Sequence, residues 1–230
     1  MYPEPQPEVF TRAFKLRGSI ISGGLTLALF VVPFFGGLGL AVLIGKRFGD
    51  APGAVAVFAA IGLALVGQIL ANQYLLLYGN AGLRRDLAAA LQRRTGHNPD
   101  DGRAYFVGWA PGRSLNPKDM ETDHDVGFLS LTPERMVFLG DTVHFELHRS
   151  QVVSVSAGIQ GIPILFDFGY RITVEWLDDY GGSNAFSLER REGRSRRQVR
   201  RGTRELRDAL QCWHQTGAAP SGAASVQPPM

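Results

Sequence analysis

The chain has 230 residues and a formal net charge of +3, a length that leaves room for one or two domains. Hydrophobic residues make up 45% of the chain and charged residues 20%, which is a composition typical of globular proteins. A single cysteine, Cys212, excludes a disulfide within the chain and agrees with a cytoplasmic location.

Two long stretches in the first third of the chain contain no charged residue. They run from Gly18 to Gly45 and from Ala51 to Gly79, and KRFGD lies between them. Each stretch exceeds the roughly 20 residues that a helix needs to cross a bilayer. A signal peptide has a shorter apolar part, and the core helices of a soluble protein keep some polar face. We therefore expect a transmembrane helical hairpin over residues 18–79, after an N-terminal tail of residues 1–17.

The charges that flank this hairpin predict its orientation. Basic residues stand outside both of its ends: Arg12, Lys15, Arg17, Arg84, Arg85, Arg93 and Arg94. The connecting loop carries only Lys46 and Arg47. Because Lys and Arg near helix ends stay on the cytoplasmic side, we expect a protein of the inner (cytoplasmic) membrane. It would have two spans and both termini in the cytoplasm.

Residue types inside the spans suggest how the two helices associate. Small residues recur at four-residue spacing, which lets helix backbones approach closely: Gly37, Ala41 and Gly45, then Ala56, Ala60 and Ala64. Gln68 and Asn72 lie one turn apart. We interpret them as an interhelical hydrogen bond rather than an ion path, because neither span holds an ionisable side chain.

The rest of the chain predicts an α+β domain. Residues 80–103 indicate a helix that leaves the membrane or lies along its surface, with Leu83, Leu87 and Leu91 on one side, and then a linker. Seven short alternating segments separated by turn signals follow, and we expect them to form antiparallel strands: 104–109, 127–131, 135–140, 142–148, 151–157, 170–177 and 183–189. This number of short strands favours a barrel or a sandwich.

One amphipathic helix follows the strands. Its apolar face should cover an open end of the barrel and consists of Val199, Thr203, Leu206, Leu210 and Trp213. Its opposite face is basic and consists of Arg196, Arg197, Arg200, Arg201, Arg204 and Arg207. Residues 216–230 are small, polar and proline-containing, so we expect a disordered tail.

Seven antiparallel strands closed by one C-terminal helix resemble the plan of the pleckstrin-homology-like (PH-like) fold. The stretch LSLTPERMVFLGDTVHFELHRSQVVSVSAG is similar to the core of GRAM-type and bacterial PH-like domains. The matching positions are Leu131, Thr132, Arg135, Val137, Phe138, Phe145, Leu147, Val152, Val153, Ser154 and Val155. The resemblance covers residues 104–215. It implies a seven-stranded antiparallel barrel capped by a helix, which binds lipids, peptides or other domains and is not an enzyme. Bacterial members often sit beside transmembrane helices.

Other residues argue against several kinds of site. Phosphoinositide-binding members of this family use a basic loop after the first strand. Here that loop has two basic residues, Arg113 and Lys118, and four acidic residues, Asp119, Glu121, Asp123 and Asp125. Its net negative charge should repel phosphates. We interpret these carboxylates as solvated, because the spacing of a calcium loop is absent.

The alternating residues of VHFELH lie too far apart for one zinc ion, so His144, Glu146 and His148 should form a solvated strand face. We predict no metal, cofactor or catalytic residue.

The arginine-rich helix is the main functional candidate. Nine arginines between Arg190 and Arg207 face only Glu192 and Glu205. Contact with anionic headgroups or with a protein partner is expected from Arg196, Arg197, Arg200, Arg201 and Arg204. A solvated helix face is the alternative, and nucleic acid is disfavoured because no aromatic residue is interleaved.

An apolar stretch over residues 158–169 is the second candidate. Either it extends a strand into the core or packs on the hairpin, or an exposed patch is formed by Ile162, Ile164, Leu165 and Phe166.

Two functional hypotheses follow from the sequence. The first is a membrane-anchored cytoplasmic PH-like module that acts as a non-enzymatic scaffold and binds anionic lipid headgroups, a protein partner or both. The second is a small regulatory subunit of a membrane transport or envelope-stress assembly, which binds mainly through its transmembrane hairpin. Self-association into a homo-oligomer is compatible with either hypothesis.

Overall fold

The computed structural model describes residues 9–74, 79–112, 123–162 and 166–218. The chain divides into two compact units. One is a helical hairpin from Leu16 to Tyr78. The other, here called the sheet domain, combines the segment up to Lys15 with everything from Gly79 onward.

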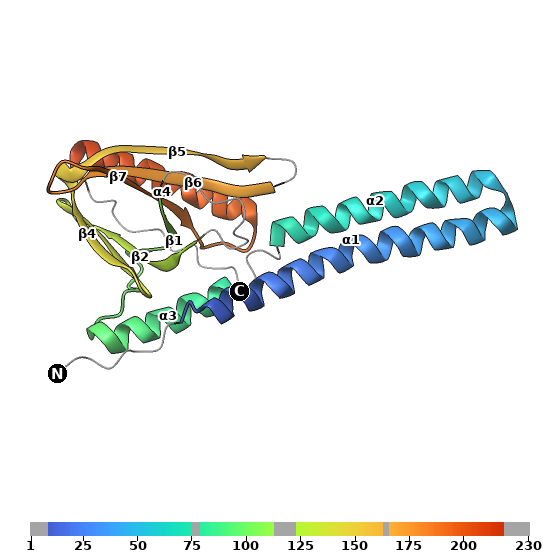
Figure 1. Ribbon diagram of the computed structural model, residues 1–230, viewed down its shortest axis with the longest axis horizontal. Helices are drawn as coiled ribbons and strands as arrows, with labels where there is room; N and C mark the ends of the chain where they lie inside the picture. Colours follow the sequence, from blue (N-terminus) through green and yellow to red (C-terminus); the bar gives the residue numbers. More distant parts are fainter. Residues whose placement is uncertain (1–8, 75–78, 113–122, 163–165, 219–230) are drawn as a thin grey trace. The chain divides into compact units, whose positions relative to one another are not determined.

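The hairpin consists of α1 (Arg12–Phe48) and α2 (Asp50–Tyr74), which run antiparallel beside each other (Figure 1). Only Gly49 separates them, with a φ of 97° that a residue without a Cβ adopts readily. The expected long apolar helices are therefore confirmed. Both are long and apolar enough to cross a membrane, at Gly23–Phe48 and Asp50–Ala71.

Small residues form the contact between α1 and α2. A Cβ on Gly37 would overlap Ala60, and a Cβ on Gly67 would lie 2.6 Å from the Leu29 carbonyl oxygen. On α2 the buried small residues are Gly53, Ala60, Ala64 and Ala71. Their steps of seven and four follow a coiled-coil period rather than a strict spacing of four. The predicted member Ala56 therefore falls off the seam and is half-buried.

In the sheet domain, the described residues form one antiparallel sheet of seven strands (Figure 1). The strands are β1 (Tyr105–Pro111), β2 (Asp125–Leu131), β3 (Arg135–Gly140), β4 (His144–His148), β5 (Val152–Ile162), β6 (Phe166–Leu177) and β7 (Ser183–Arg190). Their order is β4-β3-β2-β1-β7-β6-β5. All seven predicted strands are confirmed.

The predicted barrel closure is wrong, because β4 and β5 are edge strands that do not pair with each other in the described part of the sheet. A short 3₁₀ turn, η2 (Arg149–Gln151), joins them directly. Near the free edge of β5, the Gln211 side chain of the C-terminal helix donates a hydrogen bond to the Val155 carbonyl at 3.0 Å. A helix side chain thus contacts the backbone of β5 where a closed barrel would need β4.

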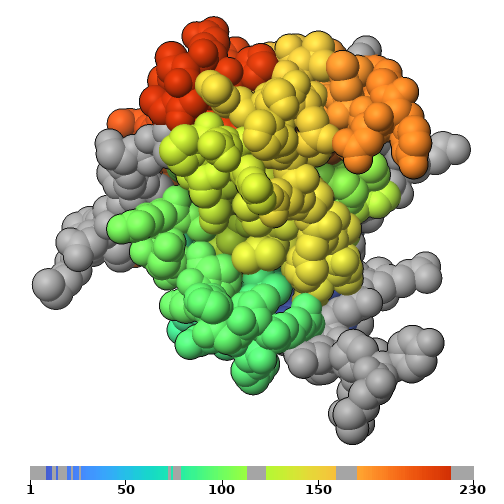
Figure 2. Space-filling view, turned by 90° about the vertical axis from the view of Figure 1, so that its left-hand side faces the viewer, coloured from blue at the N-terminus to red at the C-terminus, as the bar shows by residue number. Residues whose placement is uncertain are grey.

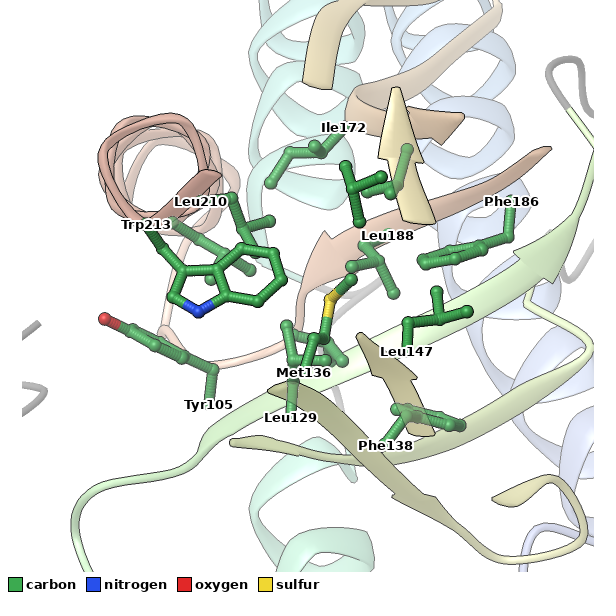
Figure 3. Packing of buried hydrophobic residues seen from close by; sticks show 14 residues of the cluster. Tyr105, Leu129, Met136, Phe138, Leu147, Ile172, Phe186, Leu188, Leu210 and Trp213 are labelled. Carbon is green, nitrogen blue, oxygen red and sulfur yellow. The ribbon is translucent and has the colours of Figure 1, made fainter. Parts of the chain in front are cut away.

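The C-terminal helix α4 (Arg196–Thr216) covers the inner face of the sheet (Figure 3). Ser195 caps its first turn, and Gly217 ends it with a φ of 70°. Its side chains Leu206, Leu210 and Trp213 are fully buried in the main core, as predicted. The core partners of these side chains include Tyr105, Leu129, Met136 and Ile172. The Trp213 indole also donates a hydrogen bond to the Thr132 carbonyl at 2.6 Å.

The apolar stretch over residues 158–169 continues β5 and β6. Ile162 of β5 pairs with Phe166 of β6, so the strands extend well beyond the predicted ends at 157 and 170. Gly158 and Gly161 interrupt the alternation of apolar residues here, so the sequence pattern does not indicate that the two strands continue. Ile164 and Leu165 lie outside the described residues.

Helix α3 (Asn80–Thr95) forms the first part of the segment 80–103, as expected, and packs on the outer face of the sheet. Its residues Leu83, Leu87 and Leu91 are buried against Phe106, Val126 and Phe128. The apolar side of this helix, expected either to leave the membrane or to lie along its surface, therefore contributes to a second core within the sheet domain.

The segment before α1 joins the same second core. Phe10 is buried in it, and the backbone N–H groups of Val9 and Phe10 donate to the Asp141 carboxylate at 2.5 and 2.6 Å. Arg94 of α3 pairs with the same carboxylate at 3.1 Å. Asp141, in the turn between β3 and β4, thus fixes the N-terminal segment to the domain.

Candidate binding surfaces

Helix α4 displays three of its arginines on one exposed face. Arg197, Arg201 and Arg204 are exposed and follow one another at steps of four and three, which places them on one side of the helix. We call these three residues the basic stripe. They form a positive surface on the side of α4 that faces away from the core.

Neighbouring groups neutralise the basic stripe only in part. Arg201 pairs with Glu205 at 2.9 Å, and both side chains are exposed. The Arg204 guanidinium lies 5.3 Å from the centre of the Tyr170 ring, which leaves its charge available. Within the described part of the chain, Arg197 makes no hydrogen bond or ion pair. Of the three, Arg197 and Arg204 are therefore the better placed to meet an anionic surface.

The other two predicted contact residues, Arg196 and Arg200, are half-buried. Burial lowers the pKa of Arg196, and the negative charge of Glu189 opposes that shift. Arg207, on the basic face predicted from sequence, donates to the Tyr170 hydroxyl at 2.8 Å and pairs with Asp208. The arginines of α4 therefore divide between internal contacts and the exposed basic stripe.

Arginines just before α4 are also used inside the domain. Arg190 pairs with Glu192, and its guanidinium lies 5.5 Å from the centre of the Tyr105 ring. Gly202 of α4 leaves room for this side chain, because a Cβ there would lie 2.8 Å from the Arg190 Cδ. The count of nine arginines in the sequence thus overstates the charge that the surface presents.

A buried charge network crosses the outer face of the sheet. Asp123 pairs with Arg171 of β6 at 2.7 Å and with Arg191 at 2.9 Å, and the Arg171 side chain is fully buried. Arg171 also reaches Glu189 of β7 at 3.5 Å. Burial raises the pKa of Glu189 to about 7, although the charge of Arg171 opposes the shift. The network ties the start of β2 to β6, β7 and the chain that leads into α4.

The prediction that the carboxylates of the acidic loop are solvated is wrong for Asp123 and for Asp125, the first residue of β2. Both are buried, and Asp125 accepts hydrogen bonds from the N–H groups of Thr142 and Val143 at 3.0 and 2.7 Å. Asp125 is thus bound into the β3–β4 turn. The remaining charged residues of this loop, Arg113, Lys118, Asp119 and Glu121, lie outside the described residues.

The alternating face of β4 is solvated, as expected. His144, Glu146 and His148 are exposed, whereas Leu147 is buried and Phe145 is half-buried. Glu146 pairs across the strands with Arg135, and the His148 ring contacts the Ser150 hydroxyl at 2.7 Å. Among the described residues, no group of three or more His, Cys, Asp or Glu side chains is placed to hold a metal ion.

Comparison of the chain with models of known protein families gives no match, and comparison with curated proteins gives no similar relative. The basic stripe and the apolar hairpin are therefore interpreted from their own chemistry.

Proposed function

We propose that the chain is a membrane-anchored, non-enzymatic binding module of the PH-like class. In this proposal the α1–α2 hairpin crosses the inner membrane, both termini are cytoplasmic, and the basic stripe binds anionic lipid headgroups. The observation that carries the lipid contact is the exposed set of Arg197, Arg201 and Arg204 on one face of α4.

The exposure pattern of the hairpin supports membrane insertion. Of 23 exposed large hydrophobic side chains in the described part of the chain, 20 belong to α1 and α2. A water-soluble unit rarely leaves so much apolar surface uncovered. Small residues between the helices and large apolar residues outside suit a lipid surrounding, in which close backbone contact rather than hydrophobic burial holds helices together.

The charge of the basic stripe is sufficient for a measurable lipid contact. Each basic residue close to an anionic membrane contributes about 1 kcal/mol. Arg197 and Arg204, which Glu205 does not neutralise, give about 2 kcal/mol, or roughly a 30-fold preference for anionic over neutral lipid. Salt screens this attraction, because the Debye length is about 10 Å at 0.1 M ionic strength. In a domain that is already tethered to the membrane by its hairpin, a free energy of this size is enough to change the orientation of the domain relative to the lipid surface.

The single cysteine offers a direct test. Cys212 is exposed on α4 and can carry a fluorophore in the full chain, reconstituted into nanodiscs that contain a headgroup-labelled acceptor lipid. Energy transfer should rise with the fraction of anionic lipid and fall with added salt. The triple change of Arg197, Arg201 and Arg204 to Gln should remove this rise.

A matched triple variant separates position from net charge. Arg85, Arg93 and Arg103 are exposed elsewhere in the domain, and changing all three to Gln removes the same charge. That control should keep most of the dependence on anionic lipid. Equal transfer in neutral and anionic nanodiscs, or equal loss in the two triple variants, would refute lipid binding through the basic stripe.

A second candidate function is a regulatory subunit of a membrane transport or envelope-stress assembly, bound through the hairpin. Gly36, Gly39 and Gly62 favour it, because a Cβ at each would meet nothing within 4 Å and a neighbouring helix could approach there. Native mass spectrometry in mild detergent should then show a partner or a second copy. Loss of that species on changing Gly36 and Gly62 to Leu would support this function, and a persistent monomer would refute it.

A further inference from the structure

A pocket of about 580 Å³ opens between the edge strand β4 and the turn that joins β6 to β7. Figure 2 shows the two walls beside each other, with β4 and the following turn in yellow and the β6–β7 segment in orange. The Gln151 side chain links them by donating to Asp179 at 3.2 Å. The pocket is separate from the basic stripe, since no residue of α4 is among its described lining residues.

Aromatic rings form much of the wall. Trp109, Phe145 and Phe186 pack in sequence, with ring centres 6.4 and 5.0 Å apart. Trp176 lines the pocket from the end of β6 and is half-buried. Tyr180, in the β6–β7 turn, is 99% exposed and also lines it. Aromatic faces carry partial negative charge and attract organic cations.

Carboxylates complete the lining. Glu146, Asp178 and Asp179 all line the pocket, and none of its described lining residues is basic. Asp178 holds the turn by accepting from the N–H groups of Tyr180 and Gly182 at 3.0 and 2.6 Å. Within the described residues, neither Asp178 nor Asp179 forms an ion pair, whereas Glu146 pairs with Arg135. The pocket therefore has net negative charge beside aromatic rings.

We propose that this pocket binds the arginine or lysine side chain of a basic segment from a partner protein. Aromatic faces and carboxylates together satisfy both the charge and the hydrogen bonds of a guanidinium or ammonium group. A phospholipid amine is a poorer match, because it is attached to a phosphate that the three carboxylates repel.

The edge of β4, which pairs with no further strand among the described residues, supports a polypeptide as the occupant. Phe145, Glu146 and Leu147 are consecutive and point to alternate faces, yet all three line the pocket, so the pocket borders the strand edge itself. An extended segment can add to such an edge through backbone hydrogen bonds while one of its side chains enters the pocket. The partner would thus bind a surface that the proposed lipid contact leaves free.

The test uses the full chain in maltoside micelles and a fluorescent acetylated hexapeptide, VTRVTV, with a matched peptide that carries citrulline in place of arginine. Citrulline keeps the shape of arginine and removes its charge. Fluorescence anisotropy should show saturable binding of the arginine peptide and at least tenfold weaker binding of the citrulline peptide. The difference corresponds to about 1.4 kcal/mol.

Variants locate the binding site. Glu146→Gln combined with Asp179→Asn removes two charges with little change in shape and should weaken the arginine peptide about tenfold. Trp176→Leu should weaken it as well, whereas Glu134→Gln, an exposed charge outside the pocket, should leave binding unchanged. Circular dichroism melts verify that each variant is folded.

Three outcomes would overturn the proposal. They are equal binding of the two peptides, binding that the Glu146/Asp179 double variant leaves intact, and displacement of the arginine peptide by phosphocholine as effectively as by arginine amide. The last result would identify a lipid-headgroup pocket instead.

Discussion

Replacing Gly108 with alanine tests the buried charge network. A Cβ at this position would overlap the Asp123 carboxylate. Gly108 lies in the middle of β1 and pairs with Val126 on one side and Glu189 on the other, so the backbone cannot move aside without breaking two ladders. The carboxylate must move instead, away from Arg171 and Arg191.

The expected cost follows from what Arg171 loses. Its side chain is fully buried, and losing Asp123 removes its ion pair at 2.7 Å. The contacts that stay include the Ser187 hydroxyl at 3.3 Å, the Ser187 carbonyl at 3.5 Å and the Glu189 carboxylate at 3.5 Å. Removing one partner of a buried ion pair costs about 3–5 kcal/mol. Because Arg171 retains these longer contacts, we expect a loss of about 3 kcal/mol. Domains of this kind are stable by about 5–15 kcal/mol, so the loss is large.

Urea unfolding in micelles, followed by tryptophan fluorescence, measures this loss. Gly158→Ala is the matched control, because Gly158 also lies in a strand but has open space at its Cβ, and it should change stability by less than about 1 kcal/mol. In a background with Asp123→Ala the obstacle is gone, so adding Gly108→Ala should cost little. Additive effects, or equal effects of the two alanines, would refute the reasoning.

Three further predictions concern other parts of the structure. Burial raises the pKa of Glu189 to about 7 from a usual 4.5, so the folded state holds this proton to higher pH than the unfolded state. Relative to Glu189→Gln, wild-type stability should therefore fall by on the order of 2 kcal/mol as the pH rises from about 5 to 8 in thermal melts. Parallel pH profiles would contradict this. Asp141→Asn should weaken the hold on the N-terminal segment by about 1–3 kcal/mol, seen as at least about fivefold faster hydrogen exchange at the Val9 amide; unchanged protection would show that the carboxylate is not the anchor. Gly67→Ala should destabilise the hairpin by about 1–3 kcal/mol, whereas Gly62→Ala, with open space, should not; equal melts would rule out a tight seam.

Alternation of side chains made the sheet predictable. In β4, Phe145 and Leu147 turn toward the core while His144 and Glu146 face solvent, as the period of two requires. Helix α4 was equally clear, because Leu206, Leu210 and Trp213 repeat at helical spacing and all are buried. These signals are local, since each depends only on neighbours in the sequence.

Contacts between residues that are far apart in the chain could not be predicted from local sequence patterns. Asp123 precedes a strand in an acidic loop, where carboxylates are usually exposed, yet it is buried against Arg171 and Arg191, far along the chain. The glycine that makes room for it, Gly108, lies in another strand. Only the strand order brings these positions together. The same limit applies to the arginines: spacing placed them on one helix, but packing decided that Arg196 is half-buried and Arg197 exposed.

The packing of α3 shows a second limit of prediction from sequence. An amphipathic helix next to an apolar hairpin has two chemically similar destinations, a membrane surface and a protein core. The periodicity of Leu83, Leu87 and Leu91 is the same for both. Phe106 and Phe128 decide between them, because these rings face away from the main core and need cover.

The N-terminal segment and α3 share one core, although the whole hairpin separates them in the chain. In topological terms the hairpin is an insertion into the sheet domain. A soluble fragment that begins at residue 100 would lack α3 and Phe10, so Phe106 and Phe128 would be uncovered and the Asp141 carboxylate would lose both N–H donors. A fragment that keeps residues 9–15 and joins them to Gly79 through a short flexible linker would preserve both. The sheet domain is therefore obtained intact by excising the hairpin from the middle of the chain.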